Sequence, residues 1–318
     1  MNETWPTRRA PAHLVIDGGL ATELASRGYD LSDHLWSARL LADAPEAIES
    51  VHLDYFEAGA DVAITASYQA SYEGFAERGI SSDDTTRLLQ RSVALARAAR
   101  QRFLDAHPDG TRVPLIAASV GPYGAIRHDG SEYHGDYELT EDELVAFHRR
   151  RFEVLVAAAP DLLACETIPS LLEARALVRL LREHPTMRAW ISFSCRDGLH
   201  NSAGDAIGDC ARLLDGVPQV VAMGVNCVAP ALVASLAAAF ASVSRKPILA
   251  YPNSGEVWNA GTRSWGGTAS RFTHYVPEWL AAGASWIGGC CRTTPRDISQ
   301  VRAAVAAFSQ CGGTAAPD

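Results

Sequence analysis

The stretch Ile287-Gly288-Gly289-Cys290-Cys291-Arg292 ends the last apolar strand that the sequence predicts. Adjacent cysteines do not readily bridge each other, because the ring that they would close is strained. On a regular strand neighbouring side chains point to opposite faces, so both thiols can serve one site only where the strand ends or bulges. Glycine tolerates positive φ and close backbone approach. The pair Gly288-Gly289 therefore predicts that both thiols leave the strand end together.

A third cysteine lies at the end of another predicted strand, in Gly224-Val225-Asn226-Cys227. Thiolates suit a soft metal ion, and zinc is the metal that we expect. Three sulfurs leave the fourth tetrahedral position of zinc open, which is typical of a catalytic site rather than a structural one. The alternative is that Cys227, Cys290 and Cys291 are buried or reactive free cysteines.

Composition is that of a globular protein. Of the 318 residues, 47% are hydrophobic and 20% charged, which is enough apolar material for two ordinary domains or one large α/β barrel. The formal net charge of -9 argues against a nucleic-acid partner, which would require clustered Lys and Arg. No apolar run reaches the length of a membrane span, and the polar N-terminus lacks the apolar segment of a secretory signal. Seven irregularly spaced cysteines make a poor disulfide framework, so we expect a cytoplasmic location.

A strand-then-helix alternation repeats about eight times. The predicted strands lie at 14–16, 62–65, 113–119, 162–166, 189–194, 220–225, 247–251 and 285–287. A doubly wound open sheet would use fewer units and would more often carry a glycine-rich phosphate fingerprint, which Asp17-Gly18-Gly19-Leu20-Ala21-Thr22 is not. We therefore expect an α/β fold, a single-domain (β/α)8 TIM barrel over 13–309, with tails at 1–12 and 310–318.

Two segments interrupt this repeat. A polar insertion spans 125–139, and Thr140-Glu141-Asp142-Glu143 follows it as a capping box that predicts a helix start. A long polar loop is expected over 252–270, between the seventh strand and the helix that follows it.

Two carboxylates follow apolar strands. Active sites of such barrels lie at the carboxyl ends of the strands, so Asp17 and Glu166 should face the same mouth as the three thiols. They could simply cap helices or anchor loops. The functional interpretation is that they bind a substrate ammonium group, while the amides of Gly18 and Gly19 bind its carboxylate.

The expected zinc site favours one kind of chemistry. Three thiolates leave the site with a net charge near minus one, which is poor for polarising a carbonyl. A free alkyl thiol has a pKa of about 8.5, and coordination removes its proton. The natural reaction is therefore alkyl transfer to a substrate thiol, which requires no catalytic histidine.

Six motifs closely resemble the homocysteine S-methyltransferase family over nearly the whole chain. They are Asp17-Gly18-Gly19-Leu20-Ala21-Thr22-Glu23-Leu24, Val51-His52-Leu53-Asp54-Tyr55-Phe56-Glu57-Ala58-Gly59-Ala60-Asp61, Thr65-Ala66-Ser67-Tyr68-Gln69-Ala70-Ser71, Gly224-Val225-Asn226-Cys227, Tyr251-Pro252-Asn253-Ser254-Gly255-Glu256 and Gly288-Gly289-Cys290-Cys291-Arg292-Thr293-Thr294-Pro295. The resemblance implies a zinc-dependent (β/α)8 enzyme of methionine biosynthesis. The implied substrates are homocysteine and a sulfonium methyl donor, S-methylmethionine first and S-adenosylmethionine second.

The resemblance also implies roles for individual residues. The Zn²⁺ ligands are Cys227, Cys290 and Cys291, and the homocysteine amino acid group is held by Asp17, Gly18, Gly19 and Glu166. Candidates for the donor side are Thr65, Tyr68, Asn226 and Asn253. Sulfonium cations favour aromatic faces, and aromatic residues in or near predicted loops are Trp36, Tyr68, Phe75, Trp258 and Trp265.

Several alternatives stay open. Betaine-dependent relatives carry two tyrosines where Gln69 and Thr167 stand here, which argues against betaine as the donor. We expect the cobalamin-independent branch, since 318 residues leave no length for cobalamin and folate domains. A non-catalytic zinc- or thiol-sensing barrel is a further alternative, and a zinc hydrolase is disfavoured because such sites use His and carboxylate ligands. The oligomeric state is open, and a monomer is compatible with the sequence.

Overall fold

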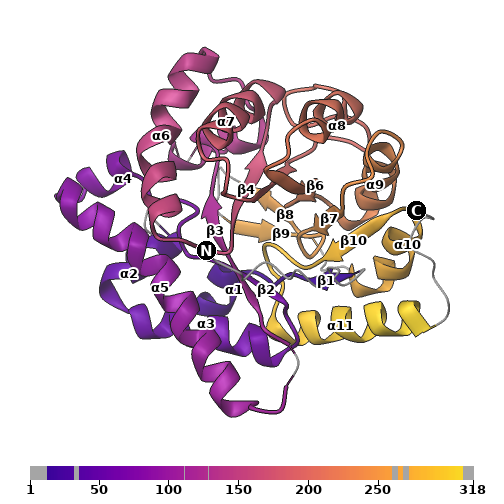
Figure 1. The fold of residues 1–318 in the computed structure, drawn as a ribbon, viewed down its shortest axis with the longest axis horizontal. Helices are drawn as coiled ribbons and strands as arrows, with labels where there is room; N and C mark the ends of the chain where they lie inside the picture. Colours follow the sequence, from indigo (N-terminus) through magenta and orange to yellow (C-terminus); the bar gives the residue numbers. More distant parts are fainter. Residues whose placement is uncertain are drawn as a thin grey trace.

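Eight parallel strands form the centre of the computed structural model, which describes residues 13–31, 36–110, 112–127, 129–259, 264–267 and 272–310 (Figure 1). The strands are β1 Leu14–Val15, β2 Val62–Ile64, β3 Leu115–Val120, β4 Leu162–Ile168, β5 Ala189–Phe193, β6 Val220–Asn226, β7 Ile248–Tyr251 and β10 Ala284–Ile287. Hydrogen bonds join them in the order β1-β10-β7-β6-β5-β4-β3-β2. Ile16 forms a parallel bridge to Val62, which brings β1 beside β2 and closes the barrel.

Helices surround the strands, as the eight predicted units require (Figure 1). They are α1 Leu20–Ser26, α2 Leu40–Asp43, α3 Pro45–Glu57, α4 Tyr72–Ala76, α5 Ser82–Ala106, α6 Glu141–Ala157, α7 Leu171–Glu183, α8 Ile207–Asp215, α9 Val233–Ala241, α10 Val276–Ala281 and α11 Pro295–Gln310. The predicted capping box starts α6: Thr140 N–H donates to Glu143 Oε2 at 2.8 Å, and Glu143 N–H donates to Thr140 Oγ1 at 3.3 Å. The (β/α)8 prediction is confirmed.

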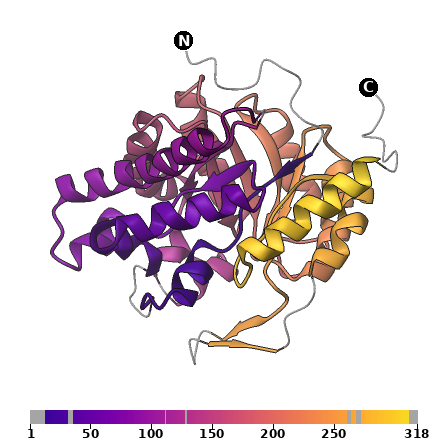
Figure 2. The same ribbon diagram turned by 90° about the horizontal axis from the view of Figure 1, so that it is seen from below.

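Two predicted loops contain more structure than expected. Two short 3-10 helices form here, η2 Tyr123–Ile126 across the start of the insertion and η3 Ser131–Tyr133 within it. The segment after β7 forms a two-stranded antiparallel hairpin, β8 Val257–Asn259 with β9 Ser264–Gly266, which projects from the barrel (Figure 2). The polar composition of this segment predicted a loop, because composition alone does not indicate which residues pair across a hairpin.

The core has two layers, one between strands and helices and one inside the barrel. Inside, Trp190 packs edge-on against Trp286 with ring centroids 6.2 Å apart, and Trp190 Nε1 donates to Tyr251 Oη at 3.0 Å. Large side chains therefore fill the barrel, and a ligand site is confined to its mouth.

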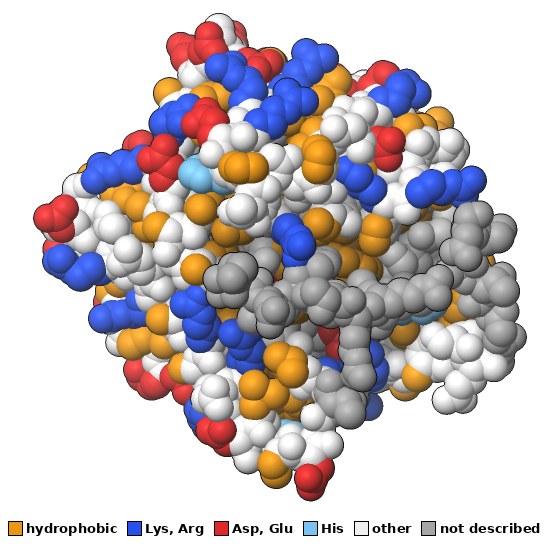
Figure 3. Space-filling view, viewed as in Figure 1, with side chains coloured by type: hydrophobic (Ala, Val, Ile, Leu, Met, Phe, Trp, Pro, Cys, Tyr) orange, Lys and Arg blue, Asp and Glu red, His pale blue; other side chains and the backbone are white. Residues whose placement is uncertain are grey.

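The surface carries both signs of charge. On the face in Figure 3, basic and acidic side chains mix around the helices. Several form ion pairs, such as Arg149 with Glu183, between α6 and α7. Within the described ranges, no helix is both long and apolar enough to cross a membrane.

Candidate active site

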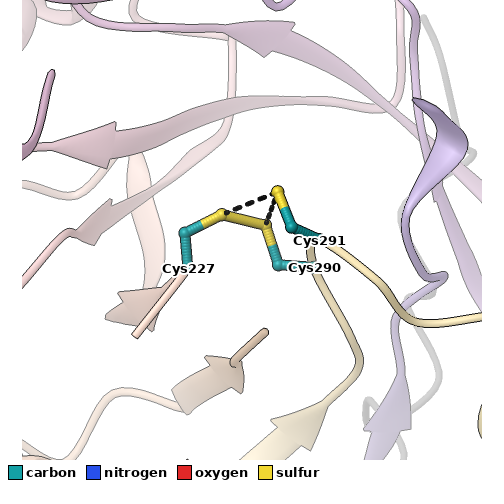
Figure 4. A group of neighbouring side chains, drawn as sticks. All are labelled: Cys227, Cys290 and Cys291. Carbon is teal, nitrogen blue, oxygen red and sulfur yellow. Dashed lines mark hydrogen bonds between the residues drawn. A yellow bond between two sulfur atoms is a disulfide. The ribbon is translucent and has the colours of Figure 1, made fainter. Parts of the chain in front are cut away.

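Three thiols from two strand ends meet at the mouth of the barrel (Figure 4). The sulfurs of Cys227, Cys290 and Cys291 all lie within 4.8 Å of one another. Cys291 Sγ is 3.9 Å from Cys227 Sγ and 4.0 Å from Cys290 Sγ. Among the described residues, this is the one His, Cys, Asp and Glu group with the spacing of a metal site. The predicted convergence of β6 and β10 on one cluster is confirmed.

Cys227 and Cys290 are joined by a disulfide, with their Cα atoms 5.5 Å apart. The prediction that this chain is a poor disulfide framework is wrong for this pair. Sequence spacing could not reveal the bond, because the cysteines stand 63 residues apart and only the closed barrel brings them together. Cys291 is a free thiol beside the bond.

Backbone hydrogen bonds fix both strand ends. Cys227 N–H donates to Tyr251 O at 3.2 Å, and Cys290 N–H donates to Pro252 O at 2.7 Å. Cys227 has φ +51°, in the left-handed region, so the chain turns sharply where β6 ends. At Gly289 the glycine is required by close approach, since a Cβ there would lie 2.3 Å from Thr293 Oγ1.

The three sulfurs suit a metal ion chemically. Burial, together with the charges of Glu166 and Glu132, raises the pKa of the Cys291 thiol to about 12. A thiolate at this position therefore needs a cation beside it. Soft sulfur donors at this spacing fit a metal ion such as zinc once the disulfide is reduced.

Asp17 lies at the end of β1, with 1% of its surface exposed. Its Oδ2 accepts the N–H of Ile64 on β2 at 2.8 Å, so the carboxylate does not serve as a cap for α1. Its Oδ1 is buried without a hydrogen-bond partner in the described part of the chain. Burial raises the pKa of Asp17 well above its usual value, and the charge of Glu166 adds to this. A cationic group on a ligand would satisfy this oxygen.

Glu166 reaches the same mouth through an irregularity in β4. The register between β4 and β5 shifts between Cys165 and Ile168, and Thr167 has φ +59°. Such a bulge re-aims a side chain, as is common beside active sites. Ser119 Oγ donates to Glu166 Oε1. Burial raises the pKa of Glu166 to about 7, opposed by the hydrogen bonds from Ser119 and Tyr251.

The two glycines after Asp17 have different surroundings. Gly19 N–H donates to Thr293 O at 3.2 Å and to Thr293 Oγ1 at 3.1 Å, so this amide is already used within the protein. The expected role of Gly19 in binding a substrate carboxylate therefore lacks support. Gly18 packs closely, since a Cβ there would lie 2.9 Å from Tyr55 Oη.

Two of the donor-side candidates lie in a hydrogen-bond network below the mouth. Thr65 Oγ1 accepts the N–H of Ser119 at 3.1 Å and pairs with Ser67 Oγ at 2.8 Å. Asn226 is fully buried and binds Thr167 through both ends of its amide. Both side chains therefore support the site from beneath, and neither is free to contact a donor.

The other candidates have mixed outcomes. Tyr68 is half-buried and hydrogen-bonds to Thr167. Asn253 is half-buried, and its Oδ1 accepts the N–H of Gly255 at 2.8 Å. Phe75 is part of the core. The side chains of Trp36, Trp258 and Trp265 lie outside the described residues.

The sequence analysis did not single out two residues of η3, the acidic Glu132 and the aromatic Tyr133. This short helix packs against β4, the strand that carries Glu166. The sequence signal for this segment was a polar insertion, and its composition does not indicate which part of the barrel it packs against.

Comparison with known proteins identifies the family. The family described as homocysteine S-methyltransferase matches residues 14–305. Homocysteine S-methyltransferase YbgG of Bacillus subtilis (strain 168) is 49% identical over 91% of this chain and 93% of its own length. The homocysteine S-methyltransferase of Escherichia coli (strain K12) is 48% identical over 91% and 94%. A solved structure of the Escherichia coli enzyme MmuM in a metallated form has TM-score 0.85 and 46% identity, covering 92% of this chain and 96% of that one. The chain belongs to the homocysteine S-methyltransferase family.

Proposed function

We propose that this protein is a zinc-dependent homocysteine S-methyltransferase. It moves a methyl group from a sulfonium donor, S-methylmethionine first and S-adenosylmethionine second, to homocysteine and so makes methionine. The observation that carries the proposal is the cluster of three sulfurs within 4.8 Å of one another at the barrel mouth. Family membership supports the same reaction.

Cys227, Cys290 and Cys291 would hold the zinc ion after reduction of the disulfide. When bound, zinc holds the homocysteine thiol as a thiolate that stays nucleophilic at neutral pH. With three ligands from the protein, the site would leave room for the substrate thiol to bind. Because all three thiols must be reduced to bind metal, a cytoplasmic location is part of the proposal.

Asp17 and Glu166 bind the ammonium group of homocysteine. The unpartnered Oδ1 of Asp17 can accept a charge-assisted hydrogen bond from it. Glu166 is held by Ser119 and Tyr251, so its carboxylate is already oriented before substrate arrives. Gly18 remains a candidate for the substrate carboxylate.

The reaction needs little acid–base chemistry. The homocysteine thiolate uses a sulfur lone pair to form a bond to the methyl carbon. The bond from that carbon to the donor sulfur breaks, and its electron pair stays on the donor sulfur, which becomes a neutral thioether. With S-methylmethionine, homocysteine and donor give two methionines and the proton from the homocysteine thiol. Opposite charges neutralise as the methyl moves, so a mouth shielded from water favours the step.

A donor comparison tests the proposal. Reduced, zinc-loaded protein is mixed with homocysteine and a methyl-labelled donor, and labelled methionine is measured by mass spectrometry. We expect turnover with S-methylmethionine, slower turnover with S-adenosylmethionine and none with betaine. Faster turnover with betaine would establish the betaine-type reaction, and no methionine from any donor would favour a sensor without turnover.

A cysteine variant tests the metal site in the same assay. Cys290→Ser should lose both zinc and methionine formation. Cys195→Ser is the matched control, because Cys195 is a free, half-buried cysteine away from the cluster. Full activity of Cys290→Ser without zinc would refute the proposed mechanism.

A further inference from the structure

The chain from the end of β7 to the start of the hairpin, residues 251–256, lies between the two strand ends that carry the thiols. We call it the bridge segment. Its backbone hydrogen-bonds to each of the three cysteines. The pairs are Cys227 N–H with Tyr251 O at 3.2 Å, Cys290 N–H with Pro252 O at 2.7 Å and Ser254 N–H with Cys291 O at 3.1 Å. The bridge segment therefore connects the β6 thiol to the two β10 thiols.

One side-chain contact strengthens the connection to β10. Glu256, the last residue of the bridge segment, accepts two hydrogen bonds from the guanidinium group of Arg292. Arg292 Nε donates to Oε2 at 3.0 Å, and Nη2 donates to Oε1 at 3.3 Å. Ser254 Oγ also donates to Oε2, at 2.8 Å.

This ion pair is not an ordinary surface pair. Exposed ion pairs contribute little as a rule, because solvent screens them and their side chains move. Here the pair is bidentate, which fixes its geometry, and only 12% of the Glu256 side chain is exposed. The hydroxyl group of Ser254 orients the same carboxylate. Glu256 can therefore hold Arg292 in one place.

Arg292 follows Cys291 directly and has an unfavourable backbone conformation. Its φ of +66° lies in the left-handed region, which is costly for a residue with a Cβ. Such a conformation persists only where its surroundings hold it. Thr22 Oγ1 accepts the N–H of Arg292 at 2.8 Å, and Glu256 holds the side chain. The turn that directs the Cys291 thiol therefore depends on contacts from both sides.

We propose that Glu256 is a positioning residue for the metal site. By binding Arg292, it keeps the turn of Cys290 and Cys291 close enough to Cys227 for all three reduced thiols to reach one metal ion. The inference rests on the proposed function, since zinc is the ion that these thiols would hold. It extends that function to an ion pair with no part in the methyl transfer itself.

The first test removes the charge of Glu256 and keeps its shape. In reduced protein, Glu256→Gln should raise the zinc dissociation constant about tenfold or more, as is typical when a group that supports metal ligands is lost. Competition with a coloured chelator measures it. Urea unfolding of the metal-free protein should keep the midpoint of wild type, which separates weaker metal binding from a general loss of stability.

Electrostatics alone predicts a change of the opposite sign. Zinc with three thiolates carries a net charge near minus one, so a carboxylate nearby disfavours the complex and its removal should strengthen zinc binding. Unchanged or tighter zinc binding by Glu256→Gln would overturn the inference. Glu183→Gln is the matched control, because it removes a carboxylate from another bidentate pair, with Arg149, between α6 and α7. It should leave the zinc dissociation constant within about twofold.

A double-mutant cycle tests whether Glu256 acts through Arg292. Arg292→Lys keeps the positive charge near the thiols but loses the planar fork, so it should weaken zinc binding about as much as Glu256→Gln. The double variant should bind no more weakly than either single variant, because one contact can be lost only once. Effects that multiply, to about 100-fold in the double variant, would show that the two residues act separately and that the inference is wrong.

These measurements need no methyl transfer, which keeps the inference separate from the proposed function. If wild type binds zinc about tenfold more tightly than Glu256→Gln yet makes no methionine, the proposed function fails and the positioning role stands. If wild type makes methionine and Glu256→Gln binds zinc equally well, only the positioning role fails.

Discussion

Asn226 binds Thr167 with both ends of its side-chain amide, one at the backbone N–H and the other at the hydroxyl group. Thr167 N–H donates to Asn226 Oδ1 at 2.7 Å, and Asn226 Nδ2 donates to Thr167 Oγ1 at 2.7 Å. Ser192 Oγ donates to the same Oδ1 at 2.8 Å. Because Asn226 precedes Cys227 and Thr167 follows Glu166, the clamp joins the strand end that carries a thiol to the one that carries a carboxylate. Thr167 and Cys227 have φ values of +59° and +51°, which are costly for side chains with a Cβ unless their surroundings hold them.

Asn226→Ala should therefore weaken both the fold and the metal site. Three buried hydrogen bonds are lost, which predicts a fall of about 2–4 kcal/mol in the free energy of unfolding. The zinc dissociation constant should rise about tenfold or more, because the backbone at Cys227 loses its support. Urea unfolding and competition with a coloured chelator measure the two effects.

Thr167 provides the matched pair for this clamp. Thr167→Ser keeps the hydroxyl group that accepts from Asn226 Nδ2 and should bind zinc like wild type. Thr167→Val keeps the shape, loses that acceptor, and should show part of the Asn226→Ala defect. Normal zinc affinity in Asn226→Ala would show that Cys227 is held without the clamp.

The convergence of the cysteines could be predicted because it follows from topology alone. In a parallel barrel all strands end at the same rim, so placing Cys227 and Cys290 at strand ends was enough to bring them together. The capping box at Thr140 was equally local, since its partners are three residues apart. Period and spacing carry this kind of information.

The direction of side chains at the strand ends could not be predicted. Asn226 precedes Cys227, a candidate metal ligand. A single sequence does not indicate that the Asn226 side chain points toward Thr167 and hydrogen-bonds to it. The amide of Gly19 is taken by Thr293, 274 residues away, a contact that only the folded chain creates. Glu132 sits in an insertion without periodicity, so the packing of η3 against β4 depends on loop geometry.

Zinc binding and the disulfide should exclude each other. Cys227 and Cys290 cannot serve as thiolate ligands while their sulfurs are bonded together. Protein that is stripped of metal and oxidised should therefore take up almost no zinc, and treatment with a thiol reductant should restore about one ion per chain. Zinc analysis and thiol titration in denaturant measure the two states. Cys291→Ser should still form the bond, and stoichiometric zinc uptake by oxidised protein would contradict this prediction.

His52 should make the fold sensitive to acid. It is fully buried on α3, and neither ring nitrogen has a hydrogen-bond partner among the residues described. Burial lowers its pKa to about 4. Between about pH 6.5 and about pH 4, His52 is protonated in the unfolded chain but neutral in the folded chain. The free energy of unfolding therefore falls as pH drops through this range. A shift of this size corresponds to about 3 kcal/mol.

His52→Leu isolates this contribution, because leucine has no proton to bind. The difference in unfolding free energy between wild type and His52→Leu should change by about 3 kcal/mol between pH 7 and pH 4. Urea unfolding of reduced, metal-free protein at both pH values measures it and avoids loss of zinc in acid. His134→Gln, at an exposed position, should follow wild type. An unchanged difference at the two pH values would mean that His52 is hydrated or paired in solution.

Gly224 should not tolerate a side chain, although the residues on either side of it in β6 carry one. A Cβ at this position would lie 1.9 Å from Leu249 O, the backbone of its partner in β7. Because a backbone atom cannot move aside without breaking the β6–β7 ladder, Gly224→Ala should lower the free energy of unfolding by about 3 kcal/mol. Gly216→Ala is the control, since a Cβ there meets nothing within 4 Å and its φ of −76° suits alanine; it should change stability by less than about 1 kcal/mol. Urea unfolding compares the pair. Equal stability of the two variants would mean that β6 and β7 can separate at this point. The pairing of β6 with β7 that places Cys227 near Cys290 would then not require a glycine at position 224.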